Sequence, residues 1–250
     1  MIRRKNEEQI EGIRKSCSLL SRLIEEIKPR VLPGVSLLEL DHFARDYILR
    51  HGGKPAFLGY EGYPATLCLS VNEVVIHGIP DNRRLAKGDI VGLDCGIDMD
   101  GYFSDAAITL AVDAVSSEAD RLMRVTRECL EKAIESVQPG ARIHDISRAV
   151  FRHATSAGFG VVRQYCGHGV GLEMHEDPQI PNYVSPGPNP RLLPGMVLAI
   201  EPMINAGTGD VRTLDDDWTV VTLDGSLSAH YEHSVLVTET GHEVLTSWQF

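Results

Sequence analysis

The spacing of apolar residues predicts four helices, arranged along the chain as two pairs. Apolar side chains recur at every third or fourth position over residues 7–28 and 37–50, and again over residues 118–137 and 143–155. This is the period of an amphipathic helix with one buried face. A Pro-Gly turn separates the two helices of each pair, and such a turn ends a helix because proline cannot continue it. Each pair of helices is followed by apolar runs that are typical of β-strands.

The two helix pairs belong to an internal repeat. Pro139-Gly140 follows Pro33-Gly34 by 106 residues, and the apolar run that ends at Glu201 follows the one that ends at Asp94 by 107 residues. A repeat of this length is too long for a solenoid. It predicts two similar halves, roughly residues 7–112 and 118–240, related by a pseudo-twofold axis. We therefore expect residues 1–250 to form a single α+β domain with a shared antiparallel sheet and helices on one face.

Composition excludes several classes of protein. The chain has 250 residues and a formal net charge of −11, and its only short basic cluster is Arg3-Arg4-Lys5, so we expect no binding of duplex nucleic acid. No apolar run is long enough to span a membrane, and the N-terminus is charged where a secretory signal is apolar. The five scattered cysteines contain no Cys-x-x-Cys, which argues against a disulfide framework or zinc ribbon. The chain is therefore predicted to be cytoplasmic and independent of membranes.

Two aspartates stand in strand-like runs where apolar residues are usual. Asp94 closes one run and Asp105 opens the next, with the hairpin signal Asp100-Gly101 between them. If paired residue numbers sum to 199, the two aspartates are direct cross-strand neighbours; if they sum to 201, both still share a face. An odd-length loop would instead turn one of them to solvent. Like charges on one sheet face destabilise it unless a cation lies between them, so a shared face would indicate a metal site.

Three further residues strengthen this interpretation. Glu201 closes an apolar strand and Glu232 precedes another, and the repeat aligns Asp94 with Glu201 and Asp105 with Glu232. His168 stands between two glycines, which allow the backbone to approach closely. One histidine and four carboxylates are more ligands than one tetrahedral zinc needs, and they suit a pair of divalent ions bridged by carboxylates. The inferred reaction class is hydrolysis.

Several motif blocks, at residues 71–80, 165–183, 200–203 and 226–233, together with the aspartate hairpin, resemble the signature of type I methionine aminopeptidases in their short bacterial form. The similarity extends from about residue 5 to about residue 245. It implies the pita-bread metallopeptidase fold and removal of the initiator methionine from nascent proteins when the second residue is small. It also implies two divalent ions per chain, drawn from Co, Mn, Fe, Zn or Ni. The metal ligands it implies are Asp94, Asp105, His168, Glu201 and Glu232, with Asp105 and Glu232 bridging.

The resemblance also implies roles for residues around the metal. His77 would contact the peptide near the scissile bond, His175 would stabilise the developing oxyanion, and Glu201 would also carry the proton of the attacking water. Gly96 and Ala106 replace hydroxyl residues that are often present in the family. A methionine pocket with Phe57 at its edge would be formed by Tyr60, Tyr63, Cys68, Met174 and Trp218.

The expected partners are the N-terminal segments of nascent peptides, with the protein acting as a monomer near the ribosome. One alternative is an Xaa-Pro peptidase, which uses the same five ligands but usually carries an additional N-terminal domain. A second is a non-catalytic binding protein of this fold, although such proteins tend to have lost metal ligands. The sequence contains no Gly-x-Ser-x-Gly and no His-Glu-x-x-His, which argues against a serine hydrolase or a zincin.

Overall fold

The four predicted helices are present in the computed structural model, which describes residues 2–248. Every helix boundary lies within two residues of its prediction. Two helices begin with a capping box, in which the side chains of Asn6 and Gln9, or of Ser36 and Glu39, bond each other's backbone N–H groups. The helical elements are α1 (Glu7–Ile27), η1 (Lys28–Arg30), α2 (Leu37–Arg50), η2 (Tyr60–Gly62), α3 (Ser117–Glu135) and α4 (Ile143–Ser156).

The strands form four antiparallel sheets among the described residues. Their orders are β1-β4-β2 with β5 beside β4, β13-β10-β6, β11-β12-β3 and β15-β14-β9-β7-β8. The strands are β1 (Lys54–Pro55), β2 (Cys68–Val71), β3 (Val74–Ile76), β4 (Ile90–Met99), β5 (Tyr102–Ala111), β6 (Gly160–Val161), β7 (Cys166–Gly169), β8 (Glu176–Pro181), β9 (Val197–Ile200), β10 (Met203–Asn205), β11 (Val211–Thr213), β12 (Val220–Thr222), β13 (Ser228–His230), β14 (His233–Val237) and β15 (His242–Val244).

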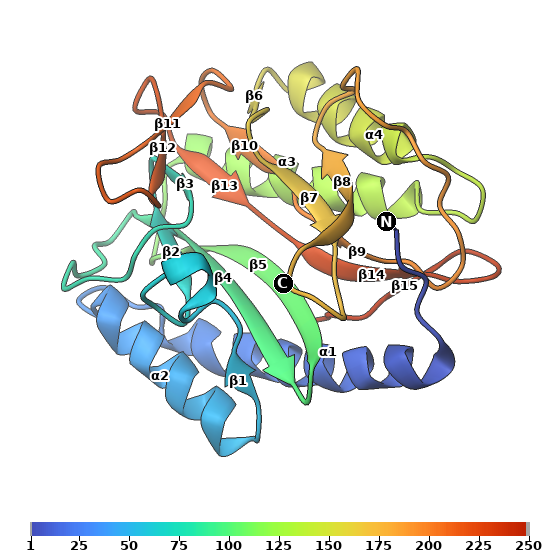
Figure 1. Ribbon diagram of the computed structural model, residues 1–250. Helices are drawn as coiled ribbons and strands as arrows, with labels where there is room; N and C mark the ends of the chain where they lie inside the picture. The colour runs from blue at the N-terminus through green and yellow to red at the C-terminus, as the bar shows by residue number, and fades with distance from the viewer. Residues whose placement is uncertain (1, 249–250) are drawn as a thin grey trace.

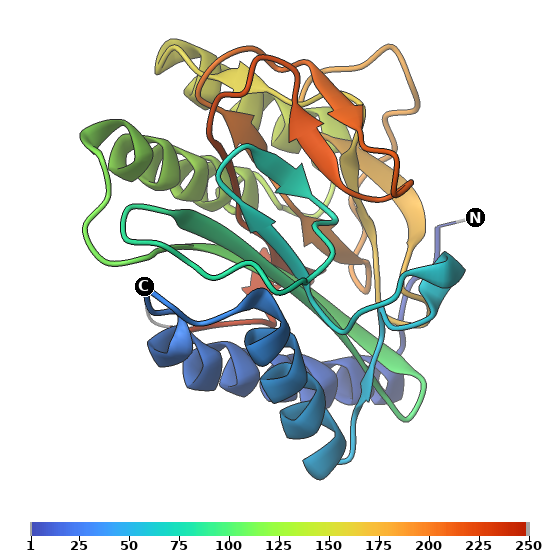
Figure 2. The same cartoon turned by 90° about the vertical axis from the view of Figure 1, so that its left-hand side faces the viewer.

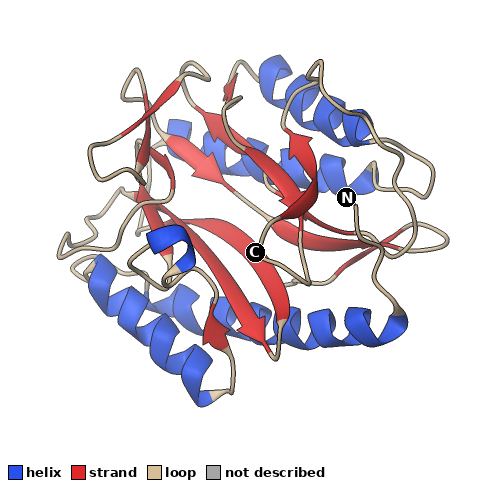
Figure 3. Cartoon of the chain, viewed as in Figure 1, coloured by secondary structure: helices blue, strands red, loops and turns tan. Residues whose placement is uncertain are grey.

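The helix pairs lie at opposite ends of the molecule, with the strands between them. Helices α1 and α2 are at the bottom of Figure 1 and α3 and α4 at the top, and Figure 3 shows the strands that separate them. The view in Figure 2 shows the long β4–β5 hairpin crossing the middle of the molecule. One continuous cluster of buried apolar side chains contains residues of all four helices and of both hairpin strands. The predicted α+β fold class is therefore confirmed.

The two halves repeat each other in backbone detail. Gly34 and Gly140 have positive φ angles of 91° and 88°, a conformation that favours glycine. Their amides donate to equivalent carbonyls, those of Leu85 at 2.7 Å and Leu192 at 2.8 Å. These matched turns confirm the pseudo-twofold architecture. The assignment of one domain with halves at residues 7–112 and 118–240 stays a prediction.

The β4–β5 hairpin has a register that the sequence had left open. Asp100 and Gly101 form its two-residue turn with φ angles of 55° and 83°, as a type I′ turn requires. Asp94 pairs with Ala107 and Asp105 with Gly96, so paired residue numbers sum to 201. The two aspartates therefore share a face, as predicted, but are diagonal and not direct neighbours. The turn decides this because it makes Met99 and Tyr102 the first pair.

The sheets of the two halves meet beside Asp105. The backbone amide of Glu232 donates to the carbonyl of Ala107 at 2.9 Å, and the amide of Asp105 donates to Oγ of Ser234 at 3.2 Å. This junction brings together the candidate metal ligands of both halves.

Of the helices in residues 2–248, none combines the length and the apolarity of a bilayer-spanning segment.

Candidate active site

A cavity of about 200 Å³ lies where the two halves meet. It is lined by strands β2, β4, β5 and β7, by the segments that follow β3, β9 and β13, and by the loop that contains η2. All five predicted metal ligands and both predicted active-site histidines line it, namely His77, Asp94, Asp105, His168, His175, Glu201 and Glu232. Residues separated by more than 150 positions in the sequence thus share one cavity.

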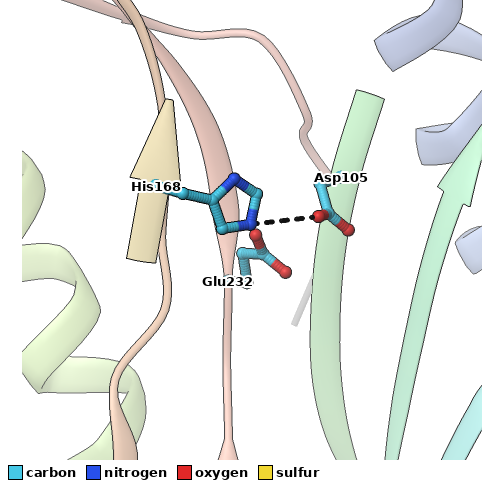
Figure 4. A group of neighbouring side chains, drawn as sticks. All are labelled: Asp105, His168 and Glu232. Carbon is cyan, nitrogen blue, oxygen red and sulfur yellow. Dashed lines mark ion pairs between the residues drawn. The ribbon is translucent and has the colours of Figure 1, made fainter. Parts of the chain in front are cut away.

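Three of the predicted ligands form a close cluster. Asp105, His168 and Glu232 point toward one another from three different segments (Figure 4). Each offers one ligand atom, and these atoms lie within 4.8 Å of one another. Nε2 of His168 is 3.6 Å from Oδ2 of Asp105 and 3.5 Å from Oε1 of Glu201. Asp94 lies one cross-strand diagonal from Asp105 on the same face of the hairpin. The five side chains therefore converge as the repeat predicted.

The four carboxyl groups bind protons unusually tightly when no cation is present. Burial raises the pKa of Asp94 to about 7 and that of Glu201 to about 8. Burial raises the pKa of Asp105 and Glu232 well above the usual range, and the negative charges of the neighbouring carboxylates raise both further. A buried cluster of this kind is costly when ionised and is stabilised by a positive counterion.

The donor atoms fit a divalent metal. Within the described residues, Oδ1 of Asp94, Oδ1 of Asp105 and Oε1 of Glu232 are buried and have no hydrogen-bond partner, although buried polar atoms are nearly always paired. The imidazole of His168 donates from Nδ1 to the carbonyl of Gly169 at 2.9 Å, so that Nε2 keeps a free lone pair. Burial lowers the pKa of His168 to about 3, and the ring is therefore neutral, as a metal ligand must be.

The two histidines predicted for the active site, His77 and His175, contact aromatic side chains. Nδ1 of His175 lies 2.8 Å from the hydroxyl of Tyr60, and its ring centroid lies 4.3 Å from that of His168. His77 meets Tyr165 edge-on at 5.7 Å between ring centroids. Its backbone has a φ of 57°, a conformation that costs free energy in a residue other than glycine and is often found at functional sites. Burial lowers the pKa of His77 to about 4, so this ring is also neutral near pH 7.

An apolar pocket adjoins the ligands. The hydroxyl of Tyr63 donates to the carbonyls of Leu67 at 2.9 Å and Gly78 at 3.0 Å, and its ring meets Trp218 edge-on at 5.1 Å. The residues predicted for the methionine pocket all belong to one hydrophobic cluster, in which Phe57, Tyr63, Cys68 and Met174 are buried and Tyr60 and Trp218 partly buried.

Met174 differs from the other predicted pocket residues. It is 2% exposed and is not among the residues that line the cavity. Its methyl group lies 2.9 Å from the position that a Cβ atom on Gly96 would occupy, and Cε1 of Phe57 lies 2.8 Å from the same position. Met174 and Phe57 thus fill the space that a side chain at residue 96 would occupy.

Several residues of the site were not assigned from the sequence. Glu61, Ile76, Tyr165 and Cys166 also line the cavity. Tyr165 and Cys166 directly precede the Gly-His-Gly motif, and this position in the sequence could have identified them as residues of the site. His230 is 4% exposed and places Nε2 3.6 Å from Oε2 of Glu201. The sequence feature that could have identified His230 is its position two residues before Glu232, since alternate residues of an extended segment point to the same side.

Comparison with known proteins agrees with this geometry. The model of metallopeptidase family M24 matches residues 11–239. The chain belongs to metallopeptidase family M24. Among curated relatives, the methionine aminopeptidase of Treponema pallidum is 53% identical over 98% of this chain and 96% of its own length. That of Clostridium perfringens is 48% identical over 98% of this chain and 99% of its own.

Solved structures of the family have the same fold. The methionine aminopeptidase of Thermotoga maritima has a TM-score of 0.96 and 43% identity, covering 99% of this chain and 100% of that one. The prolidase of Pyrococcus furiosus, at 24% identity and a TM-score of 0.82, shares the fold, and the match covers 66% of its chain. The predicted family and pita-bread fold are confirmed. Family membership, together with the buried carboxylate and histidine cluster, indicates a divalent metal cofactor.

Proposed function

We propose that this M24 protein is a methionine aminopeptidase that removes the initiator methionine from nascent proteins whose second residue is small. Near full-length similarity to enzymes of that name supports the proposal. The observation that carries it is the junction, within one cavity, of the ligand cluster and the pocket formed by Tyr63, Cys68 and Trp218. A narrow pocket of aromatic rings and sulfur suits an unbranched thioether side chain.

We further propose that two divalent ions, drawn from Co, Mn, Fe, Zn or Ni, occupy the site. Asp94, Asp105, His168, Glu201 and Glu232 would hold them. Such ions supply a water nucleophile at neutral pH and polarise the scissile carbonyl. The donor set of one imidazole and four carboxylates accepts any of these metals.

The protein's own groups would handle protons and the substrate. Glu201 lines the cavity beside His168, and its carboxylate would accept the proton of the attacking water and deliver it to the leaving amine. His175 has Nδ1 turned to the hydroxyl of Tyr60, so that its Nε2–H can donate to the carbonyl oxygen as negative charge develops there. His77 lines the same cavity and would contact the peptide beside the scissile bond.

The decisive experiment compares two substrate classes. Metal-stripped protein is assayed on a Met-Ala-Ser tripeptide and on an Ala-Pro peptide, with each of the five divalent ions added in turn. We expect metal-dependent release of methionine and little action on Ala-Pro. Faster cleavage of Ala-Pro would favour the Xaa-Pro peptidase alternative and contradict the proposal.

The Glu201→Gln variant tests the proposed proton transfer. Glutamine has nearly the same shape but cannot accept the proton, and we expect turnover of Met-Ala-Ser to fall by about 10²–10⁴-fold. The matched control is Glu173→Gln, which changes an exposed glutamate near the site. Turnover by Glu201→Gln at the rate of this control would contradict the role of Glu201.

We also propose that residues 1–250 form one catalytic domain that acts as a monomer in the cytoplasm, close to the ribosome, where nascent N-termini emerge. The continuity of the hydrophobic core through both halves supports a single domain. Light scattering of the purified protein tests the monomer, and co-sedimentation with ribosomes tests the association. A stable dimer, or no enrichment with ribosomes at low salt, would contradict the respective parts.

A further inference from the structure

His230 shares a distinctive property with the proposed metal ligands. Its Nε2 is buried and has no hydrogen-bond partner within the described residues, as is also true of Oδ1 of Asp94, Oδ1 of Asp105 and Oε1 of Glu232. Such unpaired buried atoms are rare in folded proteins. Four such atoms at one site indicate that each has a hydrogen-bond or metal partner in the working enzyme. That partner is either a bound group or a side chain that moves closer.

The backbone holds His230 firmly in place. Its amide donates to Oγ1 of Thr109 at 2.9 Å, and the same hydroxyl donates to the carbonyl of His230 at 2.8 Å. Strand β13 pairs His230 with Met203, and the hydroxyl of Tyr231 donates to the carbonyl of Thr109 at 2.8 Å. Because the residue is 4% exposed, its ring has no route to solvent and must find a partner inside the protein.

The carboxylate of Glu201 lies between two imidazoles. Its Oε1 is 3.5 Å from Nε2 of His168, and its Oε2 is 3.6 Å from Nε2 of His230. His168 lines the cavity, whereas His230 does not. Oε1 therefore lies on the side of His168, which lines the cavity, and Oε2 lies on the side of His230, which does not.

We propose that His230 is a positioning residue for Glu201, to which it donates a hydrogen bond from Nε2–H to Oε2. This bond would keep Oε1 turned toward the metal and His168. A modest closure of the 3.6 Å separation would bring the pair into hydrogen-bond range. Carboxylates that ligate metals are commonly held by such outer partners, whose loss costs about 10–100-fold in metal affinity or activity. The inference rests on the proposed function, since it supports Glu201 in its two roles.

The test replaces His230 with residues that can or cannot donate. We expect His230→Leu to weaken binding of Co²⁺ or Mn²⁺ by about 10–100-fold in calorimetric titration of the metal-stripped full chain. His230→Gln retains an N–H donor and should recover most of that loss. The kcat for Met-Ala-Ser should follow the same order with little change in KM, because His230 is not among the residues that line the cavity.

A matched control is available in α4. Nε2 of His144 is also buried without a partner in the described part of the chain, but His144 lies outside the cavity. His144→Leu should leave metal affinity unchanged, and circular dichroism reports whether each variant folds. Equal metal affinity in His230→Leu and wild type would overturn the proposal.

A second result would also overturn it. If His230→Gln binds metal as weakly as His230→Leu, and X-ray absorption of the Co²⁺ form shows one nitrogen ligand fewer, then His230 is itself a ligand. These metal-binding readouts do not use a substrate. They therefore remain interpretable even if the protein fails to cleave Met-Ala-Ser, an outcome that would count against the proposed function instead.

Discussion

Lys5 and Glu176 form a buried ion pair that ties the start of the chain to the active-site loop. Nζ of Lys5 lies 2.9 Å from Oε2 of Glu176, and the two side chains are 1% and 2% exposed. The other oxygen of Glu176 accepts from the backbone amides of Leu172 at 2.7 Å and Glu173 at 3.2 Å. Glu176 directly follows His175, so the pair fixes the loop that presents this histidine to the cavity.

Removal of the Lys5 charge should therefore affect both stability and catalysis. Lys5→Met leaves the Glu176 carboxylate buried and unpaired, and we expect the free energy of unfolding to fall by about 3–5 kcal/mol. We also expect kcat/KM for Met-Ala-Ser to fall because His175 is less well held. Arg3→Met is the matched control, since Arg3 pairs with Glu173 at an exposed position, where solvent screens the charges and the pair should contribute little to stability. Equal effects of the two variants in urea denaturation would contradict this role.

His77→Ala should separate substrate handling from metal binding. His77 lines the cavity but is not one of the five residues proposed as metal ligands. We expect turnover of Met-Ala-Ser to fall about 100-fold, a typical value for loss of a group that acts on the transition state. Metal content, measured by atomic emission, should equal that of the wild type. Loss of metal on this substitution would show that His77 is a ligand.

Gly96→Ala should disturb the methionine pocket. The added Cβ would lie 2.8 Å from Phe57 and 2.9 Å from Met174, and overpacking of this kind costs about 1–3 kcal/mol. We expect a higher KM for Met-Ala-Ser and unchanged affinity for the metal. Gly92→Ala, on the same strand, is the control because its nearest contact is an ordinary 3.4 Å. The prediction fails if both variants have the KM of the wild type.

The metal-free protein should lose stability as pH rises from about 6.5 to about 8. In the folded state the pKa of Asp94 is about 7 and that of Glu201 about 8, whereas both are near 4 in the unfolded chain. Over this window the unfolded chain has already released protons that the folded state still holds, so each pH increase favours unfolding. Thermal denaturation in EDTA at several pH values measures the effect.

Below about pH 6.5 the buried histidines act in the opposite direction. The pKa of His77 is about 4 and that of His168 about 3 in the folded state, against about 6.5 when unfolded, so acid favours the unfolded chain. Between about pH 4 and pH 6.5 the two carboxyl groups and the two histidines therefore oppose each other, and the net loss of stability should appear only above about pH 6.5. Added divalent metal should raise the melting temperature, most strongly at pH 8. A melting temperature in EDTA that rises from pH 6.5 to 8 would contradict the assignment.

The sequence alone predicted the helices, the repeat and the candidate metal ligands. The helices follow from local spacing of apolar residues, and the repeat from matched turns such as Pro33-Gly34 and Pro139-Gly140. Asp94, Asp105 and Glu201 were identifiable because a carboxylate is costly in a buried strand unless it is paired or binds a cation. These signals lie within a few residues of each other, or recur at a fixed offset, and so they can be read directly from the chain.

Tertiary structure alone decided the contacts between distant segments. The turn at Asp100-Gly101 selected the diagonal register of the aspartates. Met174 packs beside Gly96 and does not line the cavity, and folding brought His230 to Glu201. The Lys5–Glu176 pair likewise joins residues 171 positions apart. Such contacts depend on how whole elements pack against one another. Apolar periodicity specifies which face of an element is buried, but the partner it meets there is set by the three-dimensional arrangement of the chain.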